Sequence, residues 1–561
     1  MIANTVLPPS LIIFIAAGLL FFIPQRWRLV PIVLAPVISL ALIWMTPLGD
    51  NLKLAYLNYE LLPLSVSATS RVFATIFSLM LLFGGIYAYR QASLLELMAA
   101  FVYAGSAVGV TCSGDLFSLF VYWELMAIGS TLVIWAAGTE KAYQASMRYL
   151  CIHLMGGVIL MIGIVAHVFQ TGSTQFGAIA LDGFASYAIL AGFLINAGAP
   201  PFSSWIADAY PEASPSGSVF LSAFTTKTAV YTLMIAFAGN DLLIYVGLFM
   251  VFYGIIYALL ENDMRRILAY SIVNQVGFMV TAIGIGSTLA LNGATAHAFA
   301  HIIYKALLLM SAGAVLMQTG ERRCSHLGGL FQTMPQTAIN GIIGALAISS
   351  FPFTSGFVTK SLETSAAAYE GLTWVWFLLL AASAGVFLHA GIKFPWFVFF
   401  QKDSGKRPDE ASGNMRFAMW VFSFLCLAIG LFPSAFYTIL PYPVKYEPYT
   451  ADHLITQFQL LFFAGFAFFA LLPLMKRTLT ISLDFDWVYR VFAFKLSKAF
   501  FHLYWSVDTA MRQAFLKRFY LAKDYLVAHE PSGIISRSRP SSTMVIWVTV
   551  LLSVYLIFHF L

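Results

Sequence analysis

Two histidines and a lysine recur at every fourth position in the stretch HAFAHIIYK, residues 297–305. On a helix, His297, His301 and Lys305 share one face and stack over about 12 Å. With water between them, these three groups can pass a proton along the helix. The alternative is that the histidines only hydrogen-bond to polar neighbours at a helix contact. A lysine that continues the same face favours the proton pathway.

Further ionisable side chains lie inside otherwise apolar stretches: Glu124 in FVYWELMAIG, His153 in RYLCIHLMGG, Lys227 in SAFTTKTAVY and Lys360 in GFVTKSLE. An ionised side chain at the centre of a bilayer costs roughly 2.5–3.5 kcal/mol on insertion scales, so the glutamate and the three lysines together cost on the order of 10 kcal/mol. Such a cost is comparable to the stability of a whole domain, and chance does not explain it. Removal from water favours the neutral forms of lysine and glutamate, so these groups can exchange protons near neutral pH.

Other polar residues in or near apolar segments have simpler interpretations. His153 taken alone is more often a histidine whose hydrogen bonds are satisfied in the core. Lys393 stands near the end of an apolar segment, just before Pro395, and we expect its amine to reach the membrane interface. For Asp208 and Glu212 in SWIADAYPEASP, anchoring a loop is at least as good an interpretation as a transport role.

The composition identifies the elements that must hold these groups. The chain has 561 residues, of which 60% are hydrophobic and 10% charged, with a mean hydropathy of +0.82. These values are typical of a polytopic membrane protein. Apolar runs recur to the C-terminus, and we count about 16 that are long enough to cross the bilayer as helices. The first, from Leu11 to Pro24, has no basic residue before it and no small-residue cleavage site after it, so we expect a retained span.

Positive charges predict the orientation of these spans. With the N-terminus outside, the cytoplasmic loops carry Arg26, Arg28, Arg90, Lys141, Arg265, Arg266, Arg322, Arg323, the stretch 402–407, Lys476 and Arg477. The loops between them hold little beyond Lys53, Arg71 and Lys445. This asymmetry follows the positive-inside rule and supports the number of spans.

Proline interrupts two apolar segments, NAGAPPFSSW at 196–205 and SSFPFTSGFVTK at 349–360. Proline frees a backbone carbonyl, which inside a bilayer must bind protein or water. The two interruptions lie in corresponding places of two sets of five helices, as in a transporter built from inverted repeats. Two ordinary proline kinks are the alternative.

The C-terminal part differs in character. The segment from Trp487 to about His529 mixes aromatic residues with lysine and arginine; we predict an amphipathic helix in the membrane interface, on the order of 60 Å long. We divide the chain into N-terminal transmembrane helices (1–94), the translocating core (95–400), C-terminal core helices (401–477), the amphipathic helix with a linker (478–540) and a terminal anchor (541–561).

The sequence gives no sign of a cofactor, a metal site or a nucleic-acid partner. Its four cysteines, Cys112, Cys151, Cys324 and Cys426, stand singly without CxxC spacing, which argues against iron–sulfur, zinc and disulfide frameworks. The glycine clusters lie within or beside apolar spans and do not follow a strand, unlike a nucleotide-binding loop.

Six motifs in order resemble one family. They are GDLFSLFVYWELM, PPFSSWIADAY followed by SGSVFLSAFTTKTAVY, MRRILAYSIVNQVGF, HAFAHIIYKALLLMSAG, HLGGLFQTMP and PFTSGFVTKSL. Over roughly residues 95–400 they resemble the antiporter-like subunits shared by Mrp-type cation/proton antiporters, respiratory complex I and membrane-bound hydrogenases. The resemblance is specific for this superfamily and does not select the branch.

The resemblance implies an all-α membrane fold of about 14 core helices with two inverted five-helix repeats and broken helices. Each repeat would hold half of a proton path, and a central hydrophilic axis would join the halves. In the first half, Glu124 matches the family's glutamate on the fifth span. Lys227 matches its lysine on the broken eighth span.

In the second half, Lys305 with His297 and His301 matches the family's central relay. Lys360 matches the lysine on the broken twelfth span. The tail after residue 478 is similar to the lateral helix and final anchor of the longest antiporter-like subunit of complex I, although it is shorter. The D-type subunits of Mrp complexes usually lack such a tail.

One position departs from the family pattern. A lysine usually precedes the proline interruption of the seventh span, where it pairs with the glutamate of the fifth; here the residue is Asn196, in LINAGAPP. Without that cation, desolvation favours a protonated Glu124. Glu124 would then rest protonated, or would pair with Lys227.

These inferences predict an ion-translocating subunit, closest in role to the D-type subunit of Mrp antiporters, that moves protons in exchange for a cation such as Na⁺ or K⁺ alongside other membrane subunits. A proton-pumping subunit of a redox complex like NADH–quinone oxidoreductase or a hydrogenase is the first alternative. The second is a membrane partner that only supports another transporter, such as an inorganic-carbon uptake complex. We expect the chain in the bacterial cytoplasmic membrane.

Overall fold

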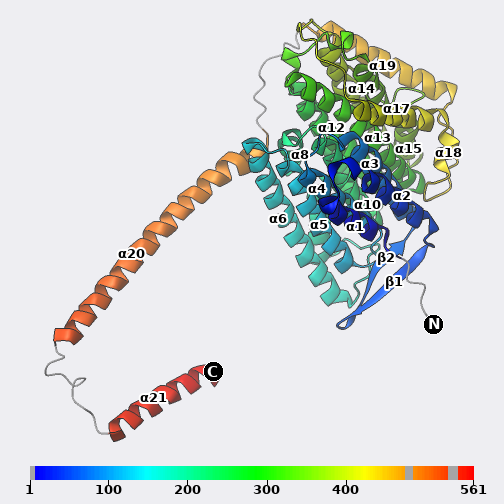
Figure 1. Ribbon diagram of the computed structural model, residues 1–561. Helices are drawn as coiled ribbons and strands as arrows, with labels where there is room; N and C mark the ends of the chain where they lie inside the picture. Colours follow the sequence, from blue (N-terminus) through cyan, green and yellow to red (C-terminus); the bar gives the residue numbers. More distant parts are fainter. Residues whose placement is uncertain (1–6, 474–483, 529–540, 561) are drawn as a thin grey trace. The chain divides into compact units, whose positions relative to one another are not determined.

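The computed structural model describes residues 7–473, 484–528 and 541–560. The chain divides into two compact units, Met1–Asp486 and Trp487–Leu561. Figure 1 shows the first unit as a bundle of helices with one β-hairpin. The basic residues Lys476 and Arg477, and His529 at the predicted end of the amphipathic helix, lie outside the described residues.

Helices long enough to span a membrane make up most of the bundle, with short helices between some of them. Its first helices are α1 (Pro9–Phe22), α2 (Leu29–Met45), α3 (Ala68–Ala88), α4 (Leu94–Thr111), α5 (Leu116–Trp135), α6 (Glu140–Thr171), α7 (Phe184–Ala197), α8 (Trp205–Ala209), α9 (Gly217–Leu221) and α10 (Thr225–Phe237). The others are α11 (Asp241–Leu260), α12 (Met264–Ile285), α13 (Thr288–Thr319), α14 (Pro335–Ile348), α15 (Ser355–Tyr369), α16 (Thr373–Val386), α17 (Gly413–Leu431), α18 (Pro433–Tyr437) and α19 (Ala451–Leu471). Within the described ranges, 13 helices of the chain are long and apolar enough to cross a membrane, and three more apolar helices are shorter. The predicted polytopic class is confirmed.

Both predicted interruptions are present. Helix α7 ends at Ala197, and Gly198 follows with a left-handed φ of 79° before α8 begins. Helix α14 ends at Ile348, and two residues with positive φ, Ser350 and Phe353, precede α15. A third interruption separates α9 from α10 at residues 222–224. Each of these places leaves helix-terminal carbonyls without an intrahelical partner.

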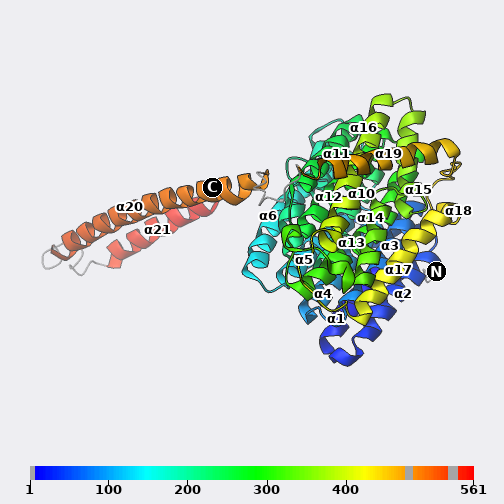
Figure 2. The same cartoon turned by 90° about the horizontal axis from the view of Figure 1, so that it is seen from above.

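Helix α13 lies in the middle of the bundle (Figure 2). It is continuous over 32 residues and packs against α3, α12, α14, α15 and α17. Most of its side chains are buried, including every residue from Ala290 to Val315. Polar side chains between Ala290 and Val315 therefore meet other helices and not lipid.

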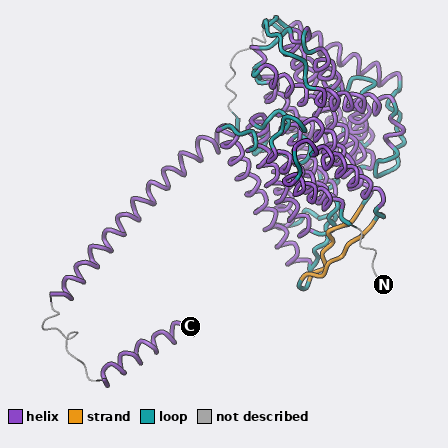
Figure 3. The backbone as a smooth tube through the Cα atoms, viewed as in Figure 1, coloured by secondary structure: helices purple, strands orange, loops and turns teal. Residues whose placement is uncertain are grey.

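A β-hairpin at one end of the bundle is an addition to the expected helices (Figure 3). Strands β1 (Gly49–Tyr56) and β2 (Tyr59–Val66) pair antiparallel. The backbone N–H of Leu62 donates to the carboxylate of Asp115, which also caps the start of α5. The hairpin is thus tied to the connection between α4 and α5. We expected helices alone and did not predict these two strands, because the segment is short and carries charges.

The second unit holds the predicted tail helices. A π-helical turn, Val488–Phe492, leads into α20 (Ala493–Ala528), and α21 spans Ser541–Phe560. The 36 residues of α20 extend about 54 Å at 1.5 Å per residue. The amphipathic helix and the terminal apolar helix are therefore confirmed as elements.

Candidate functional site

The stripe on α13 is fully buried. His297, His301 and Lys305 each have no exposed surface, and the two imidazole rings are 6.1 Å apart between centroids. Neither ring nitrogen of His301 has a hydrogen-bond partner among the described side chains and backbone groups. His301 is therefore a buried group with two unused polar atoms, of the kind that binds water or passes a proton.

A carboxylate that the sequence analysis did not single out meets the first histidine. Nδ1 of His297 lies 2.9 Å from Oε2 and 3.0 Å from Oε1 of Glu363 on α15. Both side chains are completely buried. The sequence holds only a weak indication that Glu363 belongs to the site: it follows Lys360 by three residues, so the two side chains share a face of one helix.

The other nitrogen of His297 is also engaged. The hydroxyl of Tyr304 donates to Oε1 of Gln275 at 3.0 Å, so its oxygen can accept from Nε2 of His297 at 2.8 Å. This places a hydrogen on Nε2. On the opposite side of the ring, a single proton is then shared between Nδ1 and the carboxylate of Glu363. The pair can hold this proton on either partner.

Lys305 points to α12, the helix beside α13. Its amine donates to the hydroxyl of Ser271 and, at 3.3 Å, to the carbonyl of Leu268. In the described part of the chain these contacts include no carboxylate, so no counter-charge neutralises the amine. A neutral amine with a free lone pair suits this environment, and such an amine accepts protons.

Lys227 and Lys360 are each held by a carbonyl that a helix interruption sets free. The amine of Lys227 donates to the carbonyl of Ser222 at 2.7 Å, just after α9. The amine of Lys360 donates to the carbonyl of Ile348, the last residue of α14, at 2.5 Å. It also lies 5.2 Å from the ring centroid of Phe278. Helix C-terminal ends attract positive charge, so each interruption positions the lysine that follows it.

The predicted residues from α10, α13 and α15 come together. Lys227, Lys305 and Lys360 all lie close enough to His301 for their charges to act on its ring. The same holds for Lys227 and Lys360 acting on His297. Five of the six predicted residues therefore belong to one buried cluster, centred on α13.

Glu124 stands apart from this cluster. Its Oε1 has no hydrogen-bond partner within the described ranges, and the expected alternative pairing with Lys227 does not occur, because the Lys227 amine binds Ser222 and Thr226. The carboxylate lies instead against Gly157 of α6. Asn196, which stands in place of the expected lysine, binds His153.

A further buried histidine, His389, was not singled out from the sequence, and Lys393 near it was expected elsewhere. His389 has no exposed surface and lies on a π-helical segment, Phe387–Lys393. Lys393 is 5% exposed, and its amine donates to the carbonyls of Ala258, Leu259 and Glu261. The expectation that Lys393 extends to the membrane interface was wrong, because the C-terminal carbonyls of α11 bind its amine inside the protein.

Asp208 and Glu212 anchor loops. Asp208 accepts two hydrogen bonds from Arg148, at 2.7 and 2.8 Å. Glu212 binds Arg322 at 2.8 Å. These contacts support the anchoring interpretation for both carboxylates.

The charged loops gather at one surface pocket of about 490 Å³, which is lined by Thr139, Lys141, Glu212, Glu261, Asn262, Asp263, Arg266, Gly320, Glu321, Arg322 and Arg323. Four of the basic residues assigned to cytoplasmic loops therefore lie together at this pocket.

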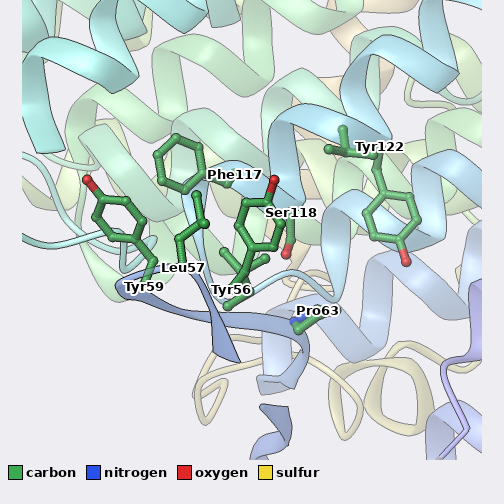
Figure 4. A pocket seen from close by; sticks show the side chains of 9 residues that line it. Tyr56, Leu57, Tyr59, Pro63, Phe117, Ser118 and Tyr122 are labelled. Atoms are coloured by element: carbon green, nitrogen blue, oxygen red, sulfur yellow. The ribbon is translucent and has the colours of Figure 1, made fainter. Parts of the chain in front are cut away.

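A separate groove of about 460 Å³ lies between the hairpin and α5 (Figure 4). Tyr56, Leu57 and Tyr59 from the hairpin face Phe117 and Tyr122 from α5. Its lining contains no Asp, Glu, Lys, Arg or His. The groove is therefore not part of the cluster of proton-binding groups.

Comparison with known proteins agrees with the motifs. Residues 113–388 match the sequence profile of the family described as "NADH:quinone oxidoreductase/Mrp antiporter, TM". The chain is 31% identical over 273 residues to the D-type subunit of the Na⁺/H⁺ antiporter of Alkalihalophilus pseudofirmus, covering 45% of this chain and 55% of that protein. It is 30% identical over 298 residues to the N-type subunit of the NADH-quinone oxidoreductase of Desulforudis audaxviator, covering 49% and 59%. The chain thus spans little more than half the length of these two relatives.

The fold has a solved counterpart. A chain in the structure of the Mrp complex from Dietzia sp. DQ12-45-1b superposes with a TM-score of 0.75 at 22% sequence identity. The match covers 98% of this chain and 62% of that chain. The expected membrane fold is confirmed. The matching family profile covers just under half of the chain, in the region of the sequence motifs.

Proposed function

We propose that this chain is an antiporter-like membrane subunit of the family shared by Mrp antiporters, complex I and hydrogenases, and that it translocates ions in a multisubunit monovalent cation/proton antiporter. Its role is that of the D-type subunit of an Mrp complex: protons move through the buried groups in exchange for Na⁺ or K⁺. The similarity to the D-type antiporter subunit of Alkalihalophilus pseudofirmus supports this branch.

One observation carries the proposal: the buried cluster on α13 connects three lysines, none of which has a carboxylate of the described residues in direct contact. Each lysine amine binds carbonyl or hydroxyl oxygens. A structural lysine in a core is usually paired with an acid. An amine held only by neutral oxygens can lose its proton and regain it, as a relay requires.

Glu363 and His297 form the site in the relay at which a proton is bound. The proton that they share can pass to either partner without leaving the buried region. Transfer to His301, whose nitrogens have no partner among the described residues, requires an intervening water molecule. From His301 the path continues to Lys305, one turn further along α13. The chain's own residues therefore supply the proton carriers.

The location and partners follow from the same assignment. The basic loops that line the charged pocket would face the cytoplasm, with the N-terminus outside, in a bacterial cytoplasmic membrane. Other membrane subunits would surround the chain. The exposed apolar and basic side chains of α20 fit contact with lipid or with such subunits.

The second candidate function is proton pumping in a redox complex, where electron transfer in partner subunits supplies the energy. The similarity to the N-type subunit of an NADH-quinone oxidoreductase favours it. The buried relay would be the same, and only the coupling would differ.

Proton flux in inverted membrane vesicles tests the proposal. The chain is expressed with the subunits encoded beside it, in a host without its own antiporters, and an imposed pH gradient is followed after Na⁺, K⁺ or NADH is added. Collapse of the gradient by Na⁺ or K⁺ supports the antiporter. Proton movement only with an electron donor supports the redox complex and overturns the first proposal, and no flux under any condition favours a supporting role without transport.

A further inference from the structure

His153 on α6 is a buried histidine with one occupied and one unused nitrogen. Its ring is 1% exposed and packs between Tyr149 and Trp205, with centroids 4.0 and 4.6 Å away. Nδ1 lies 2.8 Å from Oδ1 of Asn196. An amide oxygen only accepts hydrogen bonds, so Nδ1 carries the hydrogen. Nε2 then keeps its lone pair, and it has no partner in the described part of the chain.

The carboxylate of Glu124, on α5, lies against α6 at Gly157, one helical turn along α6 from His153. A Cβ atom added to Gly157 would overlap Oε1 of Glu124, so this carboxylate sits directly on the surface of α6 at that glycine. His153 and Gly157 are four residues apart and share one face of α6. Oε1 of Glu124 also has no partner among the described groups. Two ionisable groups with unused atoms therefore occupy the same face.

We propose that His153, oriented by Asn196, exchanges a proton with Glu124 and so replaces the lysine that the first half of the path lacks. This inference rests on the proposed function and identifies the carrier in that half. One proton leaves Nε2 of the imidazolium, passes through a bridging water and arrives on the carboxylate of Glu124. The Nδ1 hydrogen bond to Asn196 stays in place during this step. Asn196 acts as a positioning residue, because it fixes the tautomer of the ring.

Hydroxyl groups continue from His153 toward Lys227. The ring of Tyr149 lies 4.0 Å from the imidazole at a tilt of 41°. Its hydroxyl lies 3.0 Å from the hydroxyl of Ser130 and 3.3 Å from that of Thr225. Thr225 opens α10 and precedes Lys227 by two residues. The hydroxyl of Tyr103 also binds Thr225, at 2.6 Å. A polar line thus joins the surroundings of His153 to the helix that bears the first lysine of the relay.

The charged and titratable neighbours of this site are few. On α6 itself and on the elements packed against it near His153, they are Arg148 and Tyr149 of α6, Glu124 of α5, Asp208 of α8, and Tyr210 and Glu212 of the adjoining turn Tyr210–Glu212. Arg148 and Asp208 bind each other, and Glu212 binds Arg322. Glu124 is therefore the acid that remains to exchange a proton with His153.

Transport by matched variants separates a carrier from a packing role. His153→Gln keeps a hydrogen-bonding side chain that cannot be protonated, and we expect transport per assembled complex to fall roughly 10²-fold. His167→Gln changes the next histidine of the same helix and should leave transport unchanged. The double variant His153→Gln with Asn196→Lys returns a protonatable group to the site and should recover much of the loss. Wild-type transport in His153→Gln, or a loss that the double variant does not recover, overturns the inference.

A spectroscopic measurement decides the inference even if the antiporter proposal fails. The complex is labelled with ¹⁵N-histidine and reconstituted in liposomes, and the His153 signals are assigned by difference from His153→Gln. The spectra are recorded from about pH 8 to about pH 4, a range that brackets the ordinary imidazole value of roughly 6.5. We expect Nδ1 to carry the hydrogen at high pH, and the Nε2 signal to respond to pH and to Glu124→Gln. An Nε2 signal indifferent to both overturns the inference, whereas absent wild-type transport with a responsive signal overturns only the proposed function.

Discussion

Glu363 and His297 face each other from α15 and α13 across 2.9 Å, and neither side chain has any exposed surface. The tyrosine–glutamine pair on the far side of the ring fixes the hydrogen on Nε2, so the remaining proton belongs jointly to the carboxylate and Nδ1. A fixed charge at this place would bear the full cost of removal from bulk solvent. A shared proton avoids that cost, which makes this contact the centre of the expected relay.

Glu363→Gln should therefore lower transport roughly 10²-fold, because an amide cannot take part in proton exchange. Glu363→Asp keeps the acid and should retain part of the activity. Glu370→Gln, at the exposed end of the same helix, is the matched control. Flux in vesicles at equal amounts of assembled complex measures all three, and wild-type flux in Glu363→Gln would contradict a role for the pair.

Lys305→Ala should abolish transport, since it removes the amine beside Ser271 and ends the stripe on α13. We expect no proton flux above the background of vesicles that lack the complex. The control is Lys445→Ala, which removes an exposed lysine and should transport normally. Retained flux in Lys305→Ala would show that protons do not pass along α13.

His301→Leu should lower transport and leave stability nearly unchanged. Both ring nitrogens lack partners among the described residues, so an apolar side chain of similar size loses no direct protein hydrogen bond and should leave thermal stability nearly unchanged. Transport should nevertheless fall roughly 10²-fold, because the step between His297 and Lys305 loses its carrier. A large fall in melting temperature would instead indicate that His301 serves the packing of the bundle.

Asp208→Ala should lower the free energy of unfolding by about 2 kcal/mol, because the guanidinium of Arg148 loses a bidentate acceptor. The double variant Arg148→Ala with Asp208→Ala should lose less than the sum of the two single changes. The wild type, the two single variants and the double variant are compared by thermal unfolding of the purified complex. Additive losses would mean that the two side chains do not stabilise each other.

The polar loop before α17, residues 402–412, should keep its structure at acidic pH. Hydrogen bonding to Arg407 lowers the pKa of Asp403 to about 2, below its ordinary value of roughly 3.9. Because the folded value is depressed, the contribution of Asp403 is complete above the ordinary value and is lost as pH falls through about 2. At about pH 3, pepsin should cut residues 402–412 faster in Asp403→Asn than in the wild type. Asp409→Asn is the control in the same loop, and equal cleavage of all three proteins would contradict the prediction.

Much of this arrangement was predictable because membranes penalise charge and unpaired backbone. The cost of burying Lys227, Lys305 and Lys360 marked them as functional, and proline marked two of the helix interruptions. In the structure the buried lysines and the helix interruptions are connected, since Lys227 and Lys360 bind carbonyls that the interruptions leave without an intrahelical partner. The inverted relation between the two halves remains a prediction.

The partners of these residues were not predictable in the same way. Glu363 and Gln275 become neighbours of His297 only when α12, α13 and α15 pack, and no spacing along the chain reveals such a contact. Tyr304 lies seven residues further along α13, on the same face as His297, but was not singled out. His389 was overlooked because a single histidine in an apolar run resembles many core histidines. Lys393 was placed wrongly because a lysine near the end of a span usually reaches the interface, whereas here helix-terminal carbonyls bind it first.

The absence of a side chain at Gly157 connects the evolution of positions 157 and 124. The carboxylate of Glu124 occupies the space into which any larger residue at 157 would project. Alanine or serine at 157 would push this flexible carboxylate away from α6, so glycine is needed there where the acid at 124 must stay on this face. An acid at 124 and a glycine at 157 should therefore be inherited together.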